Sequence, residues 1–122
     1  MPTRDHVNEL IALIRQGKFL EAYERFYAED ATTQENLEPP RVGLATLLEN
    51  ERKFLASVSD IHLERVSSLV EGERAAINWV FAVTDPNGRK IQLDEVAYQE
   101  WQDGKIVRER YYYDPGQRLR SV

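Results

Sequence analysis

The spacing of apolar residues is helical in the first half of the chain. The first apolar stripe recurs at spacings of three, one and three and consists of Val7, Leu10, Ile11 and Ile14. This period predicts a helix that Thr3 can cap and that Gly17 ends. A second, short helix is predicted over 18–26, where Phe19, Ala22, Tyr23 and Phe26 share an inner face. Together the two helices form a bent arm.

A third helix is predicted over 43–57. Its apolar positions keep a helical period, with one charged residue inside the stripe: Leu44, Leu47, Leu48, Glu51, Phe54, Leu55 and Val58. The segment before it is mostly irregular. A short strand is predicted over 31–35, because threonine favours extended backbone, and Pro39-Pro40 excludes a helix there.

From Asp60 onward the pattern predicts long strands. Four runs, 61–70, 74–84, 91–101 and 106–114, are separated by turn sequences, the last of them Asp103-Gly104. The run 74–84 carries large residues on one face, which is expected to pack on the helices: Ala75, Ile77, Trp79, Phe81 and Val83. Helices that precede an antiparallel meander indicate an α+β fold, with the helices gathered on one face of a curved sheet.

Composition narrows the classes of function. A chain of 122 residues, 42% hydrophobic and 30% charged, fits one globular domain. A net charge of −5 argues against nucleic-acid binding. No apolar run is long enough for a membrane span, and the first residues lack the apolar core of a signal sequence. The absence of cysteine excludes disulfides and thiolate chemistry and is compatible with the predicted cytoplasmic location.

The last hairpin holds the candidate chemistry. With a two-residue turn, Trp101 lies opposite Ile106, and regular alternation then defines one face. That face holds Leu93, Glu95, Ala97, Gln99 and Trp101, with Ile106, Arg108, Arg110 and Tyr112 on the partner strand. Trp101 indicates that this face points inward. A bulge of a single residue would exchange the faces and place Glu109, Tyr111 and Tyr113 inside instead.

Glu95 is the main candidate for proton transfer. A carboxylate on an inward face loses hydration, which raises its pKa toward a value useful for acid–base catalysis. In the alternative interpretation Glu95 is a structural residue, neutralised by Arg108 or Arg110, or it lies on the surface. Arg110 likewise has two interpretations: it holds an anionic oxygen of a ligand, or it forms a cross-strand salt bridge on the outer face.

Three segments in this order give the chain a family resemblance: FYAEDATTQEN at 26–36, VEGERAAINWVF at 70–81 and DEVAYQEWQDGKIVRERYYYD at 94–114. With this layout the chain resembles the SnoaL-like branch of the nuclear transport factor 2-like superfamily, as a single domain over 1–122. The resemblance implies a cone in which a curved antiparallel sheet wraps around three N-terminal helices and encloses a pocket. It also implies a homodimer formed through the outer sheet face.

The resemblance implies a protein that binds a small hydrophobic ligand or substrate. As an enzyme it would isomerise, cyclise, dehydrate or hydrolyse a carbonyl-bearing or hydroxylated substrate without a cofactor. Glu95 would move the proton, while Arg110 and Tyr112 would hold the oxygen that gains charge. The pocket would be lined by Tyr23, Tyr27, Phe54, His62, Trp79, Gln99 and Trp101. The alternative is a non-catalytic ligand-binding or dimeric accessory module. No group of residues has metal-ligand spacing, so a metal is not expected.

Overall fold

Helices and strands are segregated as the hydrophobic pattern predicts. The computed structural model describes residues 2–122, which form three α-helices, six strands and one short 3₁₀ helix. The helices are α1 (Thr3–Arg15), α2 (Phe19–Phe26) and α3 (Leu44–Ala56). The strands are β1 (Tyr27–Glu35), β2 (Arg41–Val42), β3 (Asp60–Glu71), β4 (Arg74–Thr84), β5 (Lys90–Gln102) and β6 (Lys105–Tyr112), followed by η1 (Pro115–Leu119). No helix within residues 2–122 is long and apolar enough to cross a membrane.

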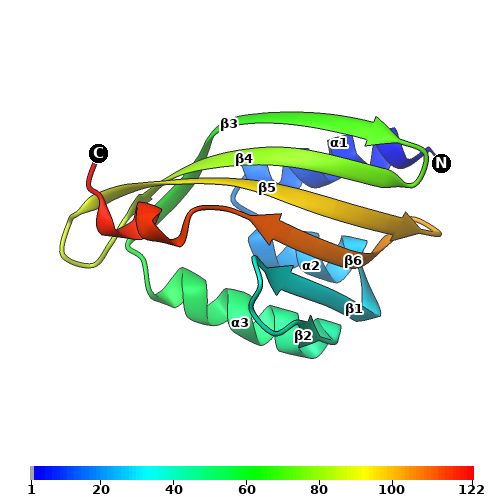
Figure 1. Cartoon of the computed structure of the whole chain (residues 1–122), viewed down its shortest axis with the longest axis horizontal. Coiled ribbons are helices and arrows are strands. Elements are labelled where there is room, and N and C mark those ends of the chain that lie inside the picture. The colour runs from blue at the N-terminus through cyan, green and yellow to red at the C-terminus, as the bar shows by residue number, and fades with distance from the viewer. Residues whose placement is uncertain (1) are drawn as a thin grey trace.

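The strands form one curved sheet in the order β2-β1-β6-β5-β4-β3. Strands β3 to β6 make the predicted antiparallel meander. β1 starts where α2 ends and pairs in parallel with β6, so the short strand predicted over 31–35 is longer than expected. The three helices lie on one face of this sheet (Figure 1). The prediction of an α+β fold with helices on one face of a curved sheet is therefore confirmed.

The core lies between the helices and the inner sheet face. The large face predicted for β4 is buried in full: Ala75, Ile77, Trp79, Phe81 and Val83. The buried side of α1 packs against it through Val7, Leu10 and Leu13. The prediction that Thr3 caps α1 is wrong, because Thr3 is already helical and the cap position is Pro2.

The final hairpin contains a bulge in β6, and beyond it the inward and outward side chains of that strand are exchanged. The turn is as predicted: Asp103 and Gly104 have φ of 51° and 77°, and Trp101 pairs with Ile106. However, the next pair is Glu100 with Arg108, so Val107 is an extra residue in β6.

Beyond the bulge the alternation of β6 is shifted by one residue. The regular register, which placed Arg108, Arg110 and Tyr112 inside, is wrong. These three residues lie on the outer face, where Arg108 forms an ion pair with Glu100 at 2.8 Å. Glu109 and Tyr111 take the inward positions, as in the bulged alternative.

Candidate functional site

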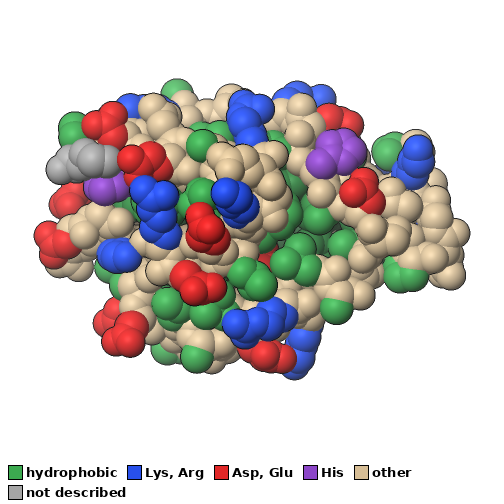
Figure 2. Space-filling model, turned by 180° about the vertical axis from the view of Figure 1, so that it is seen from behind, with side chains coloured by type: hydrophobic (Ala, Val, Ile, Leu, Met, Phe, Trp, Pro, Cys, Tyr) green, Lys and Arg blue, Asp and Glu red, His purple; other side chains and the backbone are tan. Residues whose placement is uncertain are grey.

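A cavity of about 800 Å³ lies between the helices and the inner sheet face. All three helices and all six strands contribute residues to its walls, together with η1. Figure 2 shows hydrophobic side chains gathered in a hollow in the middle of one face of the molecule, with charged side chains around it. This volume falls in the range of sites for small organic molecules.

Aromatic and aliphatic side chains cover much of the cavity wall. Tyr23 stacks on Tyr27 with ring centroids 4.4 Å apart. Trp79 stacks on Phe81 with ring centroids 6.0 Å apart. The remaining apolar lining comprises Leu10, Ile14, Phe19, Ala22, Leu47, Phe54, Ile61 and Leu93. Such a wall suits the apolar body of a ligand.

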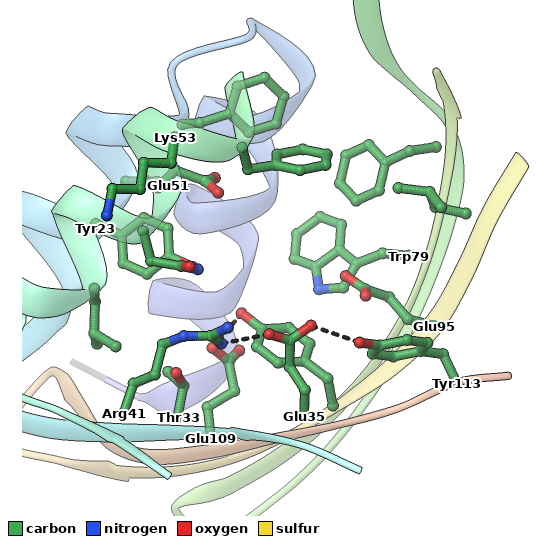
Figure 3. Close-up of a pocket in the computed structure, with 18 of the residues that line it drawn as sticks. Tyr23, Thr33, Glu35, Arg41, Glu51, Lys53, Trp79, Glu95, Glu109 and Tyr113 are labelled. Atoms are coloured by element: carbon green, nitrogen blue, oxygen red, sulfur yellow. Dashed lines mark hydrogen bonds and ion pairs between the residues drawn. The ribbon is translucent and has the colours of Figure 1, made fainter. Parts of the chain in front are cut away.

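Glu95 reaches the cavity from β5. It pairs in register with Trp79 of β4, and both side chains lie on the inner face (Figure 3). Burial raises the pKa of Glu95 to about 8, and the negative charges of Glu109, Glu35 and Glu51 add to this rise. Arg118 opposes the rise only weakly, as the smallest contribution. No ion pair within residues 2–122 neutralises the Glu95 carboxylate.

Glu51 enters the cavity from α3. It stands one helical turn after buried Leu47, and this spacing turns its carboxyl toward the inside. Burial raises the pKa of Glu51 to about 7, with further contributions from Glu109 and Glu35. Glu51 and Glu95 therefore face the cavity from different walls (Figure 3), and both carboxyls titrate near neutral pH.

Glu109 lines the cavity from β6 and is only 1% exposed. Its carboxylate accepts hydrogen bonds from the hydroxyls of Tyr27 and Tyr111, the latter at 2.6 Å, and from Gln99 Nε2 at 2.7 Å. Trp101 Nε1 donates to Gln99 Oε1 at 2.9 Å, which turns the amide nitrogen of Gln99 toward Glu109. Burial raises the pKa of Glu109, while the three donors act in the opposite direction.

Glu35, at the end of β1, differs from the other carboxyls. It accepts a hydrogen bond from Tyr113 Oη at 2.6 Å and forms an ion pair with Arg41 (Figure 3). Burial raises the pKa of Glu35, but these two partners outweigh burial and lower it below its usual value. Glu35 is therefore ionised at neutral pH. Within residues 2–122, no group of acidic and histidine side chains is arranged to hold a metal ion.

The structure brings five of the predicted site residues together on the cavity wall: Tyr23, Tyr27, Phe54, Trp79 and Glu95. Gln99 and Trp101 are buried behind Glu109 and do not line the cavity.

Three predicted site residues lie away from the cavity. His62 is exposed on β3 and lies 3.5 Å from Asp60. Arg110 donates from Nε to the Asn36 carbonyl at 3.0 Å, and its guanidinium covers the ring of Tyr112 at 4.6 Å. The predictions that place His62, Arg110 and Tyr112 on the cavity wall are wrong. For Arg110 and Tyr112 the reason is the bulge at Val107.

The sequence did not assign several polar residues of the cavity wall, among them Glu35, Glu51, Glu109, Tyr111 and Tyr113. Glu51 had a visible signal, a charge inside an otherwise apolar helical stripe. Glu109 and the two tyrosines follow only from the bulged register. Glu35 gave no signal, because its place depends on the pairing of β1 with β6 across the chain.

A curved sheet that holds a ligand-sized cavity against three helices defines the cone-shaped, nuclear transport factor 2-like class of proteins. The family model for the SnoaL-like domain matches residues 7–109, and the chain belongs to this family. Among curated proteins, none is significantly similar to the chain.

Solved structures have the same fold at low sequence identity. A candidate SnoaL-like polyketide cyclase from Mesorhizobium loti is 25% identical, with a TM-score of 0.78 over 93% of this chain and 100% of that one. A candidate polyketide cyclase from Pseudomonas putida is 20% identical, with a TM-score of 0.86 over 100% and 98%. TerC, co-crystallised with polyporic acid, is 19% identical, with a TM-score of 0.78 over 93% and 92%.

Proposed function

We propose that this SnoaL-like protein performs acid–base chemistry without a cofactor on a hydrophobic substrate that bears a carbonyl or hydroxyl group. The reaction would be an isomerisation, cyclisation, dehydration or hydrolysis. The observation that carries the proposal is the Glu95 carboxyl, which faces the cavity with its pKa raised to about 8 and no ion-pair partner within residues 2–122. A carboxyl with this pKa is protonated at neutral pH and can donate its proton to a substrate oxygen.

Glu51 is the second group in the proposed mechanism. With a pKa raised to about 7, it is partly ionised at neutral pH and can accept a proton from substrate carbon or water. Because Glu51 lies on α3 and Glu95 on β5, a substrate between them can be protonated and deprotonated on different sides.

Tyr23 takes the oxygen-holding role that Arg110 and Tyr112 cannot fill from the outer face. Burial raises the pKa of Tyr23 well above its usual value, so its hydroxyl remains protonated. A protonated hydroxyl on the cavity wall can donate a hydrogen bond to an oxygen that gains negative charge.

The proposal includes a homodimer formed through the outer sheet face and a cytoplasmic location. Apolar or aromatic side chains that remain exposed on that face support the dimer: Leu69, Val96 and Tyr112. The lack of cysteine suits a reducing compartment.

A proton-exchange screen tests the catalytic role. Hydrophobic ketones and β-hydroxyketones would be incubated with the protein in heavy water, and deuterium incorporation and dehydration followed by ¹H NMR. Glu95→Gln is expected to slow the catalysed reaction by roughly 100-fold, the usual contribution of a general acid or base. Asp94→Asn, at the preceding position of β5 but on the outer face, is the matched control and should retain the rate.

The outcomes of the screen separate the two functions that the family resemblance leaves open. Exchange that depends on Glu95 supports the enzyme. Catalysed exchange that is unchanged in Glu95→Gln would show that another group moves the proton. Binding of the ketones without any exchange would favour the non-catalytic ligand-binding module.

A further inference from the structure

The cavity is lined by more acidic than basic residues. Its acidic residues are Glu35, Glu38, Glu51, Glu95 and Glu109, and its basic residues are Arg41, Lys53 and Arg118. Arg41 is paired with Glu35. Lys53 and Arg118 are exposed, and the Arg118 guanidinium lies over the Phe54 ring at 5.5 Å. Within residues 2–122, the other acidic side chains of the cavity form no ion pair.

Aromatic rings surround the unpaired carboxyls. They come from two helices, from three strands and from the segment just after β6: Phe19, Tyr23, Tyr27, Phe54, Trp79, Phe81, Tyr111 and Tyr113. The faces of such rings attract cations and also cover flat apolar surfaces. An aromatic wall combined with unpaired carboxyls is chemically complementary to an organic cation, and it offers little to an anion.

We infer that the substrate of this pocket carries a positively charged nitrogen on a flat apolar body, and that the pocket discriminates against anionic compounds. The inference rests on the proposed function in taking the cavity as the substrate site, and it narrows the substrate class. The charged nitrogen would lie between Glu51 and Glu95, close to the rings of Tyr23 and Trp79.

Binding of a cation is coupled to proton release. Without ligand, the carboxyls of Glu51 and Glu95 hold protons up to about pH 7 and about pH 8, respectively. A cation stabilises their ionised forms and lowers both pKa values, so protons leave as it binds. The affinity for a permanent cation must therefore rise with pH through this window.

Other ionisable groups from every neighbouring element face these two carboxyls. They are Tyr23 of α2, Tyr27 and Glu35 of β1, Glu38 between β1 and β2, Arg41 of β2, Lys53 of α3, Glu109 and Tyr111 of β6, Tyr113 just after β6, and Arg118 of η1. Burial and nearby carboxyls raise the pKa of each of these tyrosines, so they remain neutral in the window. Glu35 and its partner Arg41 keep their charges throughout.

Three probes with one aromatic body and different charge test the inference. They are (2-naphthylmethyl)trimethylammonium, 2-naphthalenemethanol and 2-naphthoate, measured by isothermal titration calorimetry. At about pH 8.5 the ammonium probe is expected to bind at least about tenfold more tightly than the alcohol, and the carboxylate probe most weakly. Lowering the pH to about 6 should weaken ammonium binding at least about tenfold and leave alcohol binding nearly unchanged.

Matched variants assign the effect to the cavity carboxyls. Glu51→Gln and Glu95→Gln, singly and combined, should reduce affinity for the ammonium probe and its pH dependence, but not affinity for the alcohol. Glu49→Gln on the exposed face of α3 and Asp94→Asn on the outer face of the sheet are the controls. If the combined variant does not fold, the two single variants still show whether Glu51 and Glu95 cause the preference for the ammonium probe.

Failure of this inference can be told apart from failure of the proposed function. Equal affinity for the ammonium and alcohol probes, tighter binding of naphthoate, or no binding of any probe would overturn the inference. A loss of the ammonium preference would leave the Glu95-dependent proton exchange untouched. Conversely, if proton exchange did not depend on Glu95, the ammonium preference would still stand on the charges of the cavity.

Discussion

Glu109 shows how one buried carboxyl organises its surroundings. Its oxygens accept hydrogen bonds from two tyrosine hydroxyls and from the side-chain amide of Gln99. Trp101 orients this amide by donating a hydrogen bond to its oxygen. Gln99 and Trp101 act on this carboxyl although they do not line the cavity. After burial itself, the charge of Glu109 is the largest contribution that raises the pKa of both Glu51 and Glu95. Glu109 is therefore a positioning and electrostatic residue.

Replacing Glu109 tests this role. Glu109→Gln places an NH₂ donor opposite groups that are themselves donors, so at least one buried polar group loses its partner. We expect a loss of about 1–3 kcal/mol in the free energy of unfolding, measured with urea. The pKa of Glu95 should fall, because a nearby negative charge is removed.

The control for this substitution is Glu100→Gln, which removes a more exposed carboxyl in the adjacent strand. It should cost no more than about 1 kcal/mol. Equal losses of stability in the two variants would contradict the assigned role of Glu109.

The raised pKa of Glu95 also predicts how stability depends on pH. The folded state keeps a proton on Glu95 up to about pH 8, whereas the unfolded chain releases it near the usual value of 4.5. Stability must therefore fall as the pH rises through this window. Glu95→Gln removes that fall and should make the variant up to about 5 kcal/mol more stable than the natural sequence at about pH 9. Urea unfolding between about pH 5 and about pH 9 measures the free energy of unfolding of both proteins. If the stability of the natural chain changed with pH in the same way as that of Glu95→Gln, the raised pKa of Glu95 would be contradicted.

At the scale of elements, the bulge in β6 decides which side chains reach the cavity. A single extra residue, Val107, exchanges Arg110 and Tyr112 for Glu109 and Tyr111 on the inner face. Because side chains alternate along a strand, one inserted residue changes the whole set beyond it.

Engineered disulfides can test this register, because the chain has no cysteine of its own. In the bulged register Glu100 pairs with Arg108, whereas in the regular register it would pair with Val107. The double variant Glu100→Cys/Arg108→Cys should therefore form a cross-link under mild oxidation, and Glu100→Cys/Val107→Cys should do so far less. Mass spectrometry after trypsin digestion identifies the bond. Preferential cross-linking to position 107 would show that β6 has the regular register and that Arg110 lies on the inner face.

The sequence predicts the elements better than it predicts the site. Apolar periodicity located all three helices and the four-stranded meander, because burial of one face requires that period. It also identified Glu95, whose inward position follows from its place two and six residues before Ala97 and Trp101 on one strand face. The bulge has no comparable signal, because both Val107 and Arg108 are acceptable at either face of a strand end. The contact of Glu35 with the site depends on parallel pairing between distant segments, which no local pattern encodes.

At the scale of the whole molecule, the two faces of the sheet form different surfaces. The inner face forms the cavity, and the outer face carries Val96, 38% exposed, and Tyr112, 45% exposed, on neighbouring strands that pair in register. In the proposed dimer this outer surface is covered by a second copy of the chain.

A charge placed on the outer face tests the dimer. Val96→Glu should convert a dimer into a monomer, because like charges would meet across a two-fold interface. Light scattering coupled to size-exclusion chromatography gives the mass. Leu37→Glu, at an exposed apolar residue outside the sheet, is the control and should leave the dimer intact. A natural chain that elutes with the mass of one copy would overturn the dimer.

The most direct test of the central claim is the pKa of Glu95, measured by ¹³C NMR titration of its side-chain carboxyl, with Glu95→Gln to assign the signal. We expect a pKa of about 8 for Glu95, and a lower pKa in Glu109→Gln. A pKa at or below about 4, the ordinary range of an exposed or salt-bridged carboxylate, would contradict the claim that Glu95 is the proton donor of the cavity.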